Sequence, residues 1–190
     1  MFTNSYRIIY YENSRFLWGI ILASIPTAII GLYLESYSET LFLTTAISGY
    51  GLIFTSVLLY LSDRFEAKGG ITGLKSFLSG VVQGVAVIPG ISRSGSTITT
   101  LIFLGVKREE AAEFSFLMSL PAIFGATLLQ IRHLEALDNN MLLTYLLGTI
   151  TAFLCGLLAI HIMLMFVKNA SLKIFALYCL ILGIVTVIWL

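Results

Sequence analysis

The stretch SFLSGVVQGVAVIPGISRSGSTITTLIFLGV, residues 76–106, decides the fold because a Pro-Gly break divides it into two apolar arms. Each arm has about 12 residues and is about 18 Å long as a helix, whereas a bilayer core is about 30 Å thick. Pro89 disfavours helix at the residue before it, and Gly90 tolerates a sharp turn. We therefore predict a re-entrant hairpin of two half-length helices over residues 76–106. A single broken span is the alternative.

The composition of the chain is that of a membrane protein. Of its 190 residues, 58% are hydrophobic and 11% are charged, and the mean hydropathy is +0.96. Soluble domains do not have such a composition. We predict an all-α integral membrane protein with a single membrane domain over residues 1–190, an interfacial tail over residues 1–15 and no nucleic-acid partner. About five transmembrane helices are expected, at Phe16–Leu34, Leu41–Leu61, Phe114–Gln130, Met141–Val167 and Ile174–Leu190.

The positions of Lys and Arg distinguish the hairpin from a single broken span. With a hairpin, Arg132 lies on one side of the membrane and nine basic residues lie on the other: Arg7, Arg15, Arg64, Lys68, Lys75, Lys107, Arg108, Lys168 and Lys173. With a single crossing the division becomes six against four. Because basic residues gather on the cytoplasmic side, the hairpin is favoured, with a cytoplasmic N-terminus and a C-terminus outside.

Arg93 lies between the two apolar arms, where a charge requires a function or a partner. On insertion scales a charge at bilayer depth costs about 2.5 to 3.5 kcal/mol unless it faces protein or water. Ser92 or Ser94 is expected to cap a second helix that starts beside this arginine. The alternative is a Ser/Gly loop between helices whose arginine extends to a lipid headgroup.

The start of that second helix has the features of a phosphate site. We expect free amide groups in its first turn, at Gly95, Ser96 and Thr97. A helix N-terminus with a partial positive charge and an adjacent guanidinium is suited to bind phosphate. Hydroxyl groups of Ser92, Ser94 and Thr97 would add donors.

Other polar residues fit structural roles as well as functional ones. Gln83 either packs with Gly80 and Gly84 or contacts the substrate. Acidic side chains at the start of the next span complement the helix dipole, and these are Glu109, Glu110 and Glu113. We interpret His161 as a packing residue and His133 as a solvated loop residue. Cys155 and Cys179 lie in apolar spans and indicate neither a disulfide framework nor a metal cluster.

Two segments, QGVAVIPGISRSGSTIT and FLGVKREEAAEFSFLMSLPAIFGA, resemble the second half of the undecaprenyl-diphosphate phosphatase family of bacteria and archaea. IPTAIIGLYLE resembles a span of the same family. The family motif P-G-x-S-R-S-x-x-T is matched at Pro89, Gly90, Ser92, Arg93, Ser94 and Thr97. The resemblance implies one half of an inverted-repeat architecture in the plasma membrane. It also implies hydrolysis of a polyprenyl diphosphate to the monophosphate, which recycles the lipid carrier of cell-envelope glycan synthesis.

The resemblance implies roles for the motif residues. We assign Ser92 and Arg93 as catalytic residues, with Arg93 binding phosphate. As substrate-binding residues we predict Pro89, Gly90, Ser94, Gly95, Thr97 and Gln83. The resemblance also implies a divalent cation, Mg²⁺ or Ca²⁺, but no metal ligand is assigned in this chain.

The resemblance does not extend to a second, N-terminal hairpin that carries E-x-x-x-E and Ser-Ser-Thr-Gly-His in members of the family. Three interpretations follow. The favoured one is a phosphatase whose natural chain extends further at its N-terminus. The second is an active short form that pairs as a homodimer or recruits a partner, with Glu113 or His161 as a substitute base. The third is a non-catalytic membrane protein that binds or transports a phosphorylated polyprenyl lipid.

Overall fold

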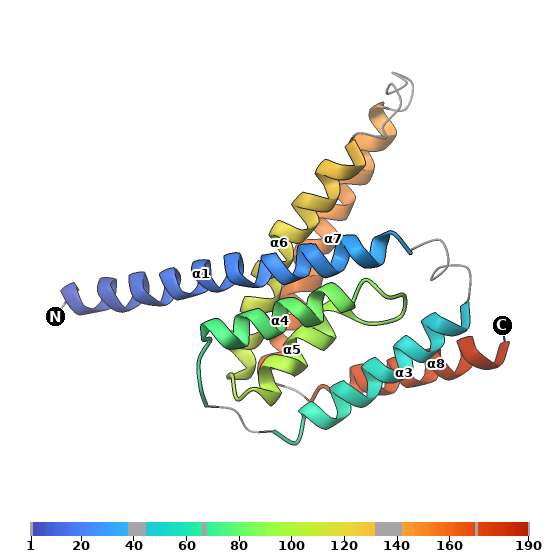
Figure 1. The fold of residues 1–190 in the computed structure, drawn as a ribbon, viewed down its shortest axis with the longest axis horizontal. Coiled ribbons are helices and arrows are strands. Elements are labelled where there is room, and N and C mark those ends of the chain that lie inside the picture. Colours follow the sequence, from blue (N-terminus) through green and yellow to red (C-terminus); the bar gives the residue numbers. More distant parts are fainter. Residues whose placement is uncertain (1, 38–44, 66–67, 132–141, 170, 190) are drawn as a thin grey trace.

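The computed structural model describes residues 2–37, 45–65, 68–131, 142–169 and 171–189, and its regular elements in these ranges are all helices (Figure 1). This confirms the predicted all-α class. The helices are α1 (Phe2–Glu35), α3 (Thr45–Ser62), α4 (Gly73–Val85), α5 (Arg93–Phe103), α6 (Arg108–Ile131), α7 (Leu142–Asn169) and α8 (Lys173–Trp189). Residues 2–15, predicted as an interfacial tail, continue into the first span within α1.

Four helices in the described part of the chain are long and apolar enough to cross a membrane. They are Ser14–Glu35, Thr45–Ser62, Arg108–Leu129 and Leu143–Val167. The fifth predicted span corresponds to α8, an apolar helix of 17 residues. Large apolar side chains such as Ile21, Ile25 and Ile29 of α1 are exposed, and only 6% of the span in α7 is buried. An apolar exterior of this kind is typical of a protein surrounded by lipid.

The two short helices α4 and α5 form a hairpin whose two ends meet. The amide of Gly69 donates to the carbonyl oxygen of Gly105 at 2.9 Å, and the amide of Lys107 donates to the carbonyl of Gly69 at 3.0 Å. The segment before α4 and the segment after α5 therefore lie side by side. Gly105 has a φ of +81° and ends α5, with the amide of Val106 bonded to the carbonyl of Leu101 at 2.9 Å.

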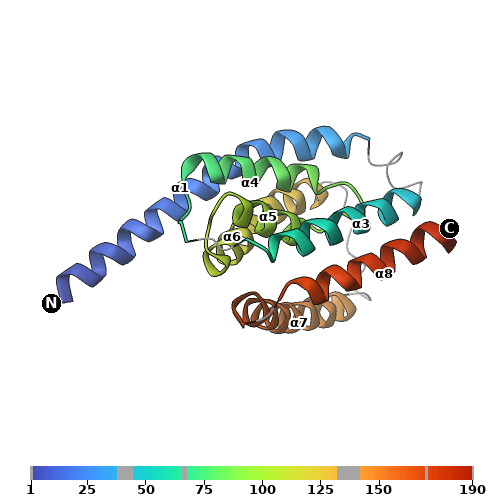
Figure 2. The same ribbon diagram turned by 90° about the horizontal axis from the view of Figure 1, so that it is seen from below.

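The hairpin lies between longer helices that cover it on several sides. Helix α4 contacts α1, and α5 contacts α3, α4 and α6 (Figures 1 and 2). The contact of α4 with α1 is close because Gly80 faces Ala23, where a Cβ on the glycine would collide with the alanine carbonyl. On the other side, α3 packs along α8 through Gly49 and Gly183. These small residues bring the helix backbones together.

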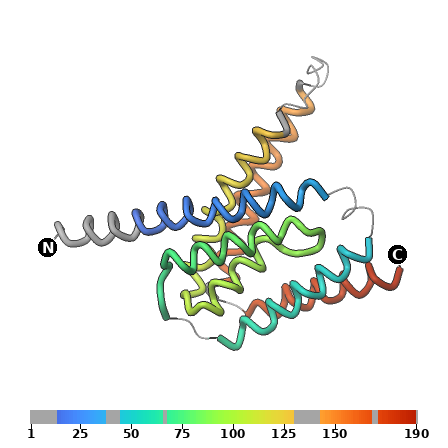
Figure 3. Tube along the Cα trace, in the orientation of Figure 1, coloured from blue at the N-terminus to red at the C-terminus, as the bar shows by residue number. Residues whose placement is uncertain are grey.

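The hairpin contributes much of the buried interior. Ile98, Leu101 and Ile102 of α5 are at most 1% exposed and pack in one cluster with Phe114 and Met118 of α6. Helix α6 continues beyond this cluster together with α7, and the pair extends past the rest of the fold (Figure 3). Helix α5, the shortest of the described helices, is thus the most enclosed one, and this enclosure holds its first turn in a defined position.

Asp63 joins three helices near the base of the hairpin. Its carboxylate pairs with Arg108 at 2.9 Å and with Lys173 at 3.5 Å, and it accepts a hydrogen bond from the Ser171 hydroxyl at 2.7 Å. Burial alone would raise the pKa of Asp63, but hydrogen bonds from Ser171 and Arg108 and the charge of Arg108 outweigh it and lower the pKa. The end of α3 and the starts of α6 and α8 are therefore held together.

Candidate functional site at the hairpin tip

The tip of the hairpin is a short run of tight turns between α4 and α5. Helix α4 ends at Val85, and the chain turns at Gly90, whose φ is +84°. A side chain at Gly90 would be strained by this φ and would also collide with the carbonyl of Ser48 in α3. Ser92 is the N-cap of α5, and its hydroxyl oxygen accepts a hydrogen bond from the amide of Gly95 at 3.1 Å. Of the two capping residues that the sequence left open, the structure thus selects Ser92.

The free amides of α5 are not the predicted ones. The amide of Gly95 is bonded to the Ser92 side chain, and the amide of Ser96 is bonded to the Ser92 carbonyl at 2.9 Å. Because the helix begins at Arg93, the amides without a partner in the described chain are those of Arg93 and Ser94. The prediction of free amides at Gly95, Ser96 and Thr97 was therefore wrong by about two residues. The free amide donors therefore lie in the first two residues of α5, one of which is Arg93.

Arg93 is the open cationic group of the tip. Its side chain is exposed and forms no ion pair or hydrogen bond with the described residues. The adjacent Ser94 is half-buried, and its hydroxyl has no partner there. One guanidinium, two amides and one hydroxyl thus remain available as donors on the same helical turn. This set matches the requirements of a phosphate group.

The tip lies deep relative to the base of the hairpin. It contacts α3 at Gly51, where a Cβ would come 2.5 Å from the carbonyl oxygen of Pro89. Asp63, at the base, is twelve residues further along the chain and directly follows the end of α3. At the rise of an α-helix this separation is about 18 Å, more than half of a hydrocarbon core about 30 Å thick. Arg93 is therefore far from the charged end of the molecule.

Thr97 and Gly95, both predicted to bind substrate, lie inside the fold. Thr97 is fully buried, and its hydroxyl contacts the carbonyl of Arg93 at 2.9 Å and the hydroxyl of Ser115 at 2.5 Å. Gly95 is buried under Ser92, whose Oγ would lie 2.8 Å from a Cβ on the glycine. In this structure both residues hold the first turn of α5 in place, and neither has a free polar side-chain group directed outward.

Gln83 also faces the interior and not the tip. It is 2% exposed, and its Nε2 donates to the carbonyl of Met118 in α6 at 3.3 Å. This carbonyl lies three residues before Pro121, where a helix is weakened by the missing amide. The Oε1 of Gln83 has no partner in the described chain, and neither has the Oγ of Ser96. A small polar layer is thus buried between α4, α5 and α6.

The tip residues make contacts that the sequence did not indicate. Thr55 of α3 is fully buried and accepts a hydrogen bond from the amide of Ser92 at 3.0 Å. Together with Gly51 it forms a Gly-x-x-x-Thr pair on one face of α3. This spacing is the one feature of the sequence that could have indicated a contact with the tip, but it is also common in ordinary packing of transmembrane helices.

In the described part of the chain, the acidic and imidazole side chains do not gather at the tip. Glu109 and Glu113 have the spacing E-x-x-x-E on α6, but they lie in its first turns, next to the hairpin base. Glu110 accepts the amide of Ile71 at 2.8 Å and so holds the loop before α4. His161, interpreted from the sequence as a packing residue, is instead exposed on α7. Among the described residues, no three His, Cys, Asp or Glu side chains lie close enough to form a metal site. Predictions on Arg132 and His133 lie outside the described residues.

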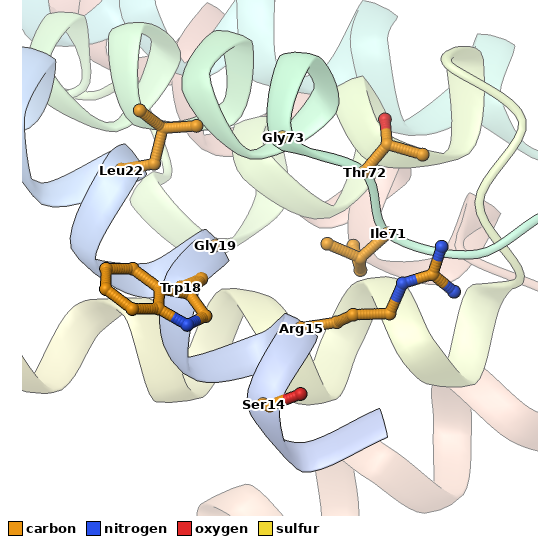
Figure 4. A pocket seen from close by; sticks show the side chains of 8 residues that line it. All are labelled: Ser14, Arg15, Trp18, Gly19, Leu22, Ile71, Thr72 and Gly73. Atoms are coloured by element: carbon orange, nitrogen blue, oxygen red, sulfur yellow. The ribbon is translucent and has the colours of Figure 1, made fainter. Parts of the chain in front are cut away.

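Two hollows lie near the start of α4, at the base end. One has a volume of about 280 Å³ and is lined by Arg15 and Trp18 of α1 and by Ile71, Thr72 and Gly73 (Figure 4). The Arg15 side chain extends toward Ile71 in this view. The second hollow, of about 310 Å³, shares Arg15 and Ile71 with the first. Its lining also includes Lys68, Lys107, Glu110 and Glu113. Basic residues from separate parts of the chain thus gather at this end.

These features define a class of protein: a multi-pass helical membrane protein in which an enclosed short hairpin carries an unpaired arginine at a helix N-terminus. A family model described as Bacitracin resistance protein BacA matches residues 2–185. The chain belongs to this family. The resemblance found in the sequence motif is therefore confirmed.

Curated relatives have the same name in several organisms. The chain is 44% identical over 181 residues to the undecaprenyl-diphosphatase of Methanosphaera stadtmanae, covering 93% of this chain and 65% of the relative. It is 45% identical over 175 residues to that of Desulforapulum autotrophicum, covering 89% of this chain and 63% of the relative. For the Halothermothrix orenii protein the identity is 39%, with 95% and 73% covered. The chain thus spans slightly less than two thirds of the first two relatives.

Proposed function

We propose that this protein hydrolyses undecaprenyl diphosphate, or a similar polyprenyl diphosphate, to the monophosphate and inorganic phosphate, and so recycles the lipid carrier of cell-envelope glycan synthesis. The observation that carries the proposal is the start of α5. There the unpaired Arg93 and the free amides of Arg93 and Ser94 follow the turn that contacts Gly51, and Gly51 is about 18 Å from Asp63 along the helix rise of α3. The names of the curated relatives support the same substrate.

In this proposal the tip neutralises the diphosphate. The planar guanidinium of Arg93 binds two phosphate oxygens, and the amides of Arg93 and Ser94 donate to the same group. The two amides are fixed before the substrate arrives, because α5 is enclosed by α3, α4 and α6. Phosphoryl transfer is accelerated mainly by positioning and by stabilisation of negative charge, and the tip supplies both.

Ser92 acts in this proposal as a donor as well as a cap. Its oxygen accepts the amide of Gly95, which leaves its own hydrogen free to donate to a phosphate oxygen. A nucleophilic serine needs an adjacent base. Among the described residues, no carboxylate or imidazole is hydrogen-bonded to Ser92, so we assign it no nucleophilic role.

We further propose that the base end faces the cytoplasm. Arg15, Lys68 and Lys107 line one hollow there, and Arg108 and Lys173 share Asp63 nearby. Basic residues are retained on the cytoplasmic side of a bilayer. The tip then lies in the half of the membrane that is nearer the outside. Helix α8 starts at the base end, which gives a C-terminus outside.

A divalent cation, Mg²⁺ or Ca²⁺, is part of the proposal because of the family. The described residues do not fit a complete cation site, since no three ligating side chains come together in them. No step above depends on the cation. Removal of divalent cations with EDTA tests this part separately, and phosphate release that is unaffected by EDTA would contradict it.

The proposal is tested by measuring phosphate release from undecaprenyl diphosphate by the purified chain in detergent with Mg²⁺ or Ca²⁺. We expect release by the wild type and at least a roughly hundredfold loss in Arg93→Ala, since charge-stabilising donors contribute factors of this size. Arg64→Ala is the matched control, because Arg64 is an exposed arginine at the base end that contacts the ring of Tyr60. Unchanged release by Arg93→Ala would overturn the assignment of the tip.

A second candidate function is binding or transport of a phosphorylated polyprenyl lipid without hydrolysis. The observation that favours it is the lack of a described base in contact with Ser92. It predicts Arg93-dependent binding of the lipid without release of phosphate. If a homodimer completes the site, the rate of phosphate release per mole of protein should instead rise with protein concentration.

A further inference from the structure

We propose that Thr55 of α3 is a positioning residue for the phosphate-binding tip. The inference rests on the proposed function, because it concerns how the tip is held for a diphosphate. Thr55 lies outside the P-G-x-S-R-S-x-x-T motif, in a different helix. Its hydroxyl lies within hydrogen-bonding distance of two motif residues, Gly90 and Ser92, and its methyl group faces Gly95.

The hydroxyl of Thr55 connects α3 with both ends of the turn. It accepts the amide of Ser92 at 3.0 Å. Its single hydrogen is directed to the carbonyl of Gly51 at 2.9 Å, with the carbonyl of Gly90 at 3.4 Å as the alternative acceptor. Because Thr55 is fully buried, no water is at hand to replace these bonds.

The methyl group of Thr55 packs toward Gly95, beside the N-cap residue Ser92. Its Cγ2 would lie 3.5 Å from a Cβ on Gly95, the residue whose amide is bonded to Ser92. The side chain therefore contacts the N-cap residue through a hydrogen bond, and its methyl group faces the third residue of α5. The hydrogen bond and this close approach determine the direction in which the first turn of α5 faces.

This first turn carries the Arg93 guanidinium and both free amides of the tip. The amide of Ser92 is the last one before Arg93, so a shift of Ser92 moves the amides of Arg93 and Ser94 with it. Thr55 makes no direct contact with a ligand in this scheme. It determines whether the guanidinium and the two amides converge on one phosphate group, and its loss is expected to lower turnover by misplacing these donors.

The experiment compares Thr55→Val, which keeps the shape and removes the hydroxyl, with Thr55→Ser, which keeps the hydroxyl. Thr99→Val is the matched control, because Thr99 is also fully buried and its hydroxyl donates to the carbonyl of Ser96 within α5, its one hydrogen-bond partner in the described part of the chain. We expect Thr55→Val to lower kcat/KM by roughly tenfold or more, the effect of one buried hydrogen bond. Thr55→Ser should recover most of this loss, and Thr99→Val should remain near the wild type.

A second measurement separates positioning from loss of stability. Amide hydrogen exchange at Ser92 should become faster in Thr55→Val and not in Thr99→Val, while the unfolding temperatures of the two variants in detergent remain similar. Equal kcat/KM in Thr55→Val and Thr99→Val would overturn the inference, and so would unchanged exchange at Ser92. If neither the wild-type chain nor Arg93→Ala binds the lipid or releases phosphate, the proposed function fails. Amide hydrogen exchange at Ser92 still decides, in that case, whether Thr55 holds the tip.

Discussion

The amide of Gly69 and the carbonyl of Gly105 are joined by a hydrogen bond of 2.9 Å, although all of α4, the tip and α5 lie between them in the chain. This bond, with that from Lys107 to Gly69, places the entry and the exit of the hairpin at the same end of the molecule. A segment that crossed the membrane once would have these two residues on opposite sides.

The first prediction concerns this topology. In a background in which Cys155 and Cys179 are replaced by Ala, single cysteines at Lys68 and Lys107 should react with a membrane-impermeant thiol reagent from the same side. A cysteine at Ser36, which follows α1, should react from the other side. Labelling of Lys68→Cys and Lys107→Cys from opposite sides would contradict the hairpin.

The second prediction concerns the contact between α3 and the tip. A Cβ at Gly51 would lie 2.5 Å from the carbonyl oxygen of Pro89 and 2.8 Å from the carbonyl carbon of Gly90. Gly51→Ala should therefore displace the tip and lower Arg93-dependent lipid binding by roughly tenfold, as overpacking of about 1–3 kcal/mol predicts.

Gly125→Ala is the control for that variant, because a Cβ at Gly125 meets no atom within 4 Å. It should bind the lipid as the wild type does. If both variants bind equally well, α3 does not hold the tip tightly.

The third prediction concerns Asp63. Asp63→Asn keeps the size of the side chain and removes the charge shared by Arg108 and Lys173, so the free energy of unfolding at pH 7 should fall by about 1–3 kcal/mol. Because the pKa of Asp63 is lower in the folded state, its contribution is complete above the ordinary pKa of about 3.9 and is lost as the pH falls further.

Thermal unfolding in detergent from pH 7 to pH 3 measures this effect. The difference between wild type and Asp63→Asn should be constant at neutral pH and should shrink below about pH 4. A difference that grows with acidification would have the wrong sign for a lowered pKa.

The fourth prediction separates packing from substrate contact at Gln83. Gln83→Met keeps the length of the side chain and removes the Oε1 that has no partner in the described chain. The lost bond to Met118 and the removed unsatisfied acceptor should nearly cancel, leaving stability within about 1 kcal/mol of the wild type. Phosphate release should also be retained. A loss comparable to that in Arg93→Ala would instead make Gln83 part of the binding site.

The fifth prediction concerns the type of cation at position 93. Arg93→Lys retains the charge but lacks the planar fork that contacts two phosphate oxygens. Its kcat/KM should lie closer to that of Arg93→Ala than to that of the wild type. Full recovery by lysine would show that charge alone is required.

Local pattern predicted the hairpin well. Pro89 and Gly90 act through their own backbones, and the length of each arm is visible in the sequence. The capping residue remained open because Ser92 and Ser94 are chemically equal, and the position of Gly95 under Ser92 decided between them. The free amides were misplaced by about two residues for the same reason.

The tertiary contacts of the tip were beyond such patterns. Thr55 and Gly51 read as ordinary small residues of a transmembrane helix, and nothing near them in the sequence refers to Ser92. Thr97 read as a ligand because it belongs to the motif, yet it is bonded inward to Ser115. Contacts between residues far apart in the chain depend on how the helices pack, and short-range patterns in the sequence do not show that packing.

The carboxylate of Asp63 also has a consequence for biosynthesis. Its partner Arg108 is 45 residues further along the chain and Ser171 is 108 residues further. During translation the Asp63 carboxylate can pair with Arg108 before Ser171 has been made. Its bond to Ser171 forms only when the segment before α8 has left the ribosome. Until then α3 lacks the helix against which Gly49 packs, so a helix made later completes the support of an earlier one.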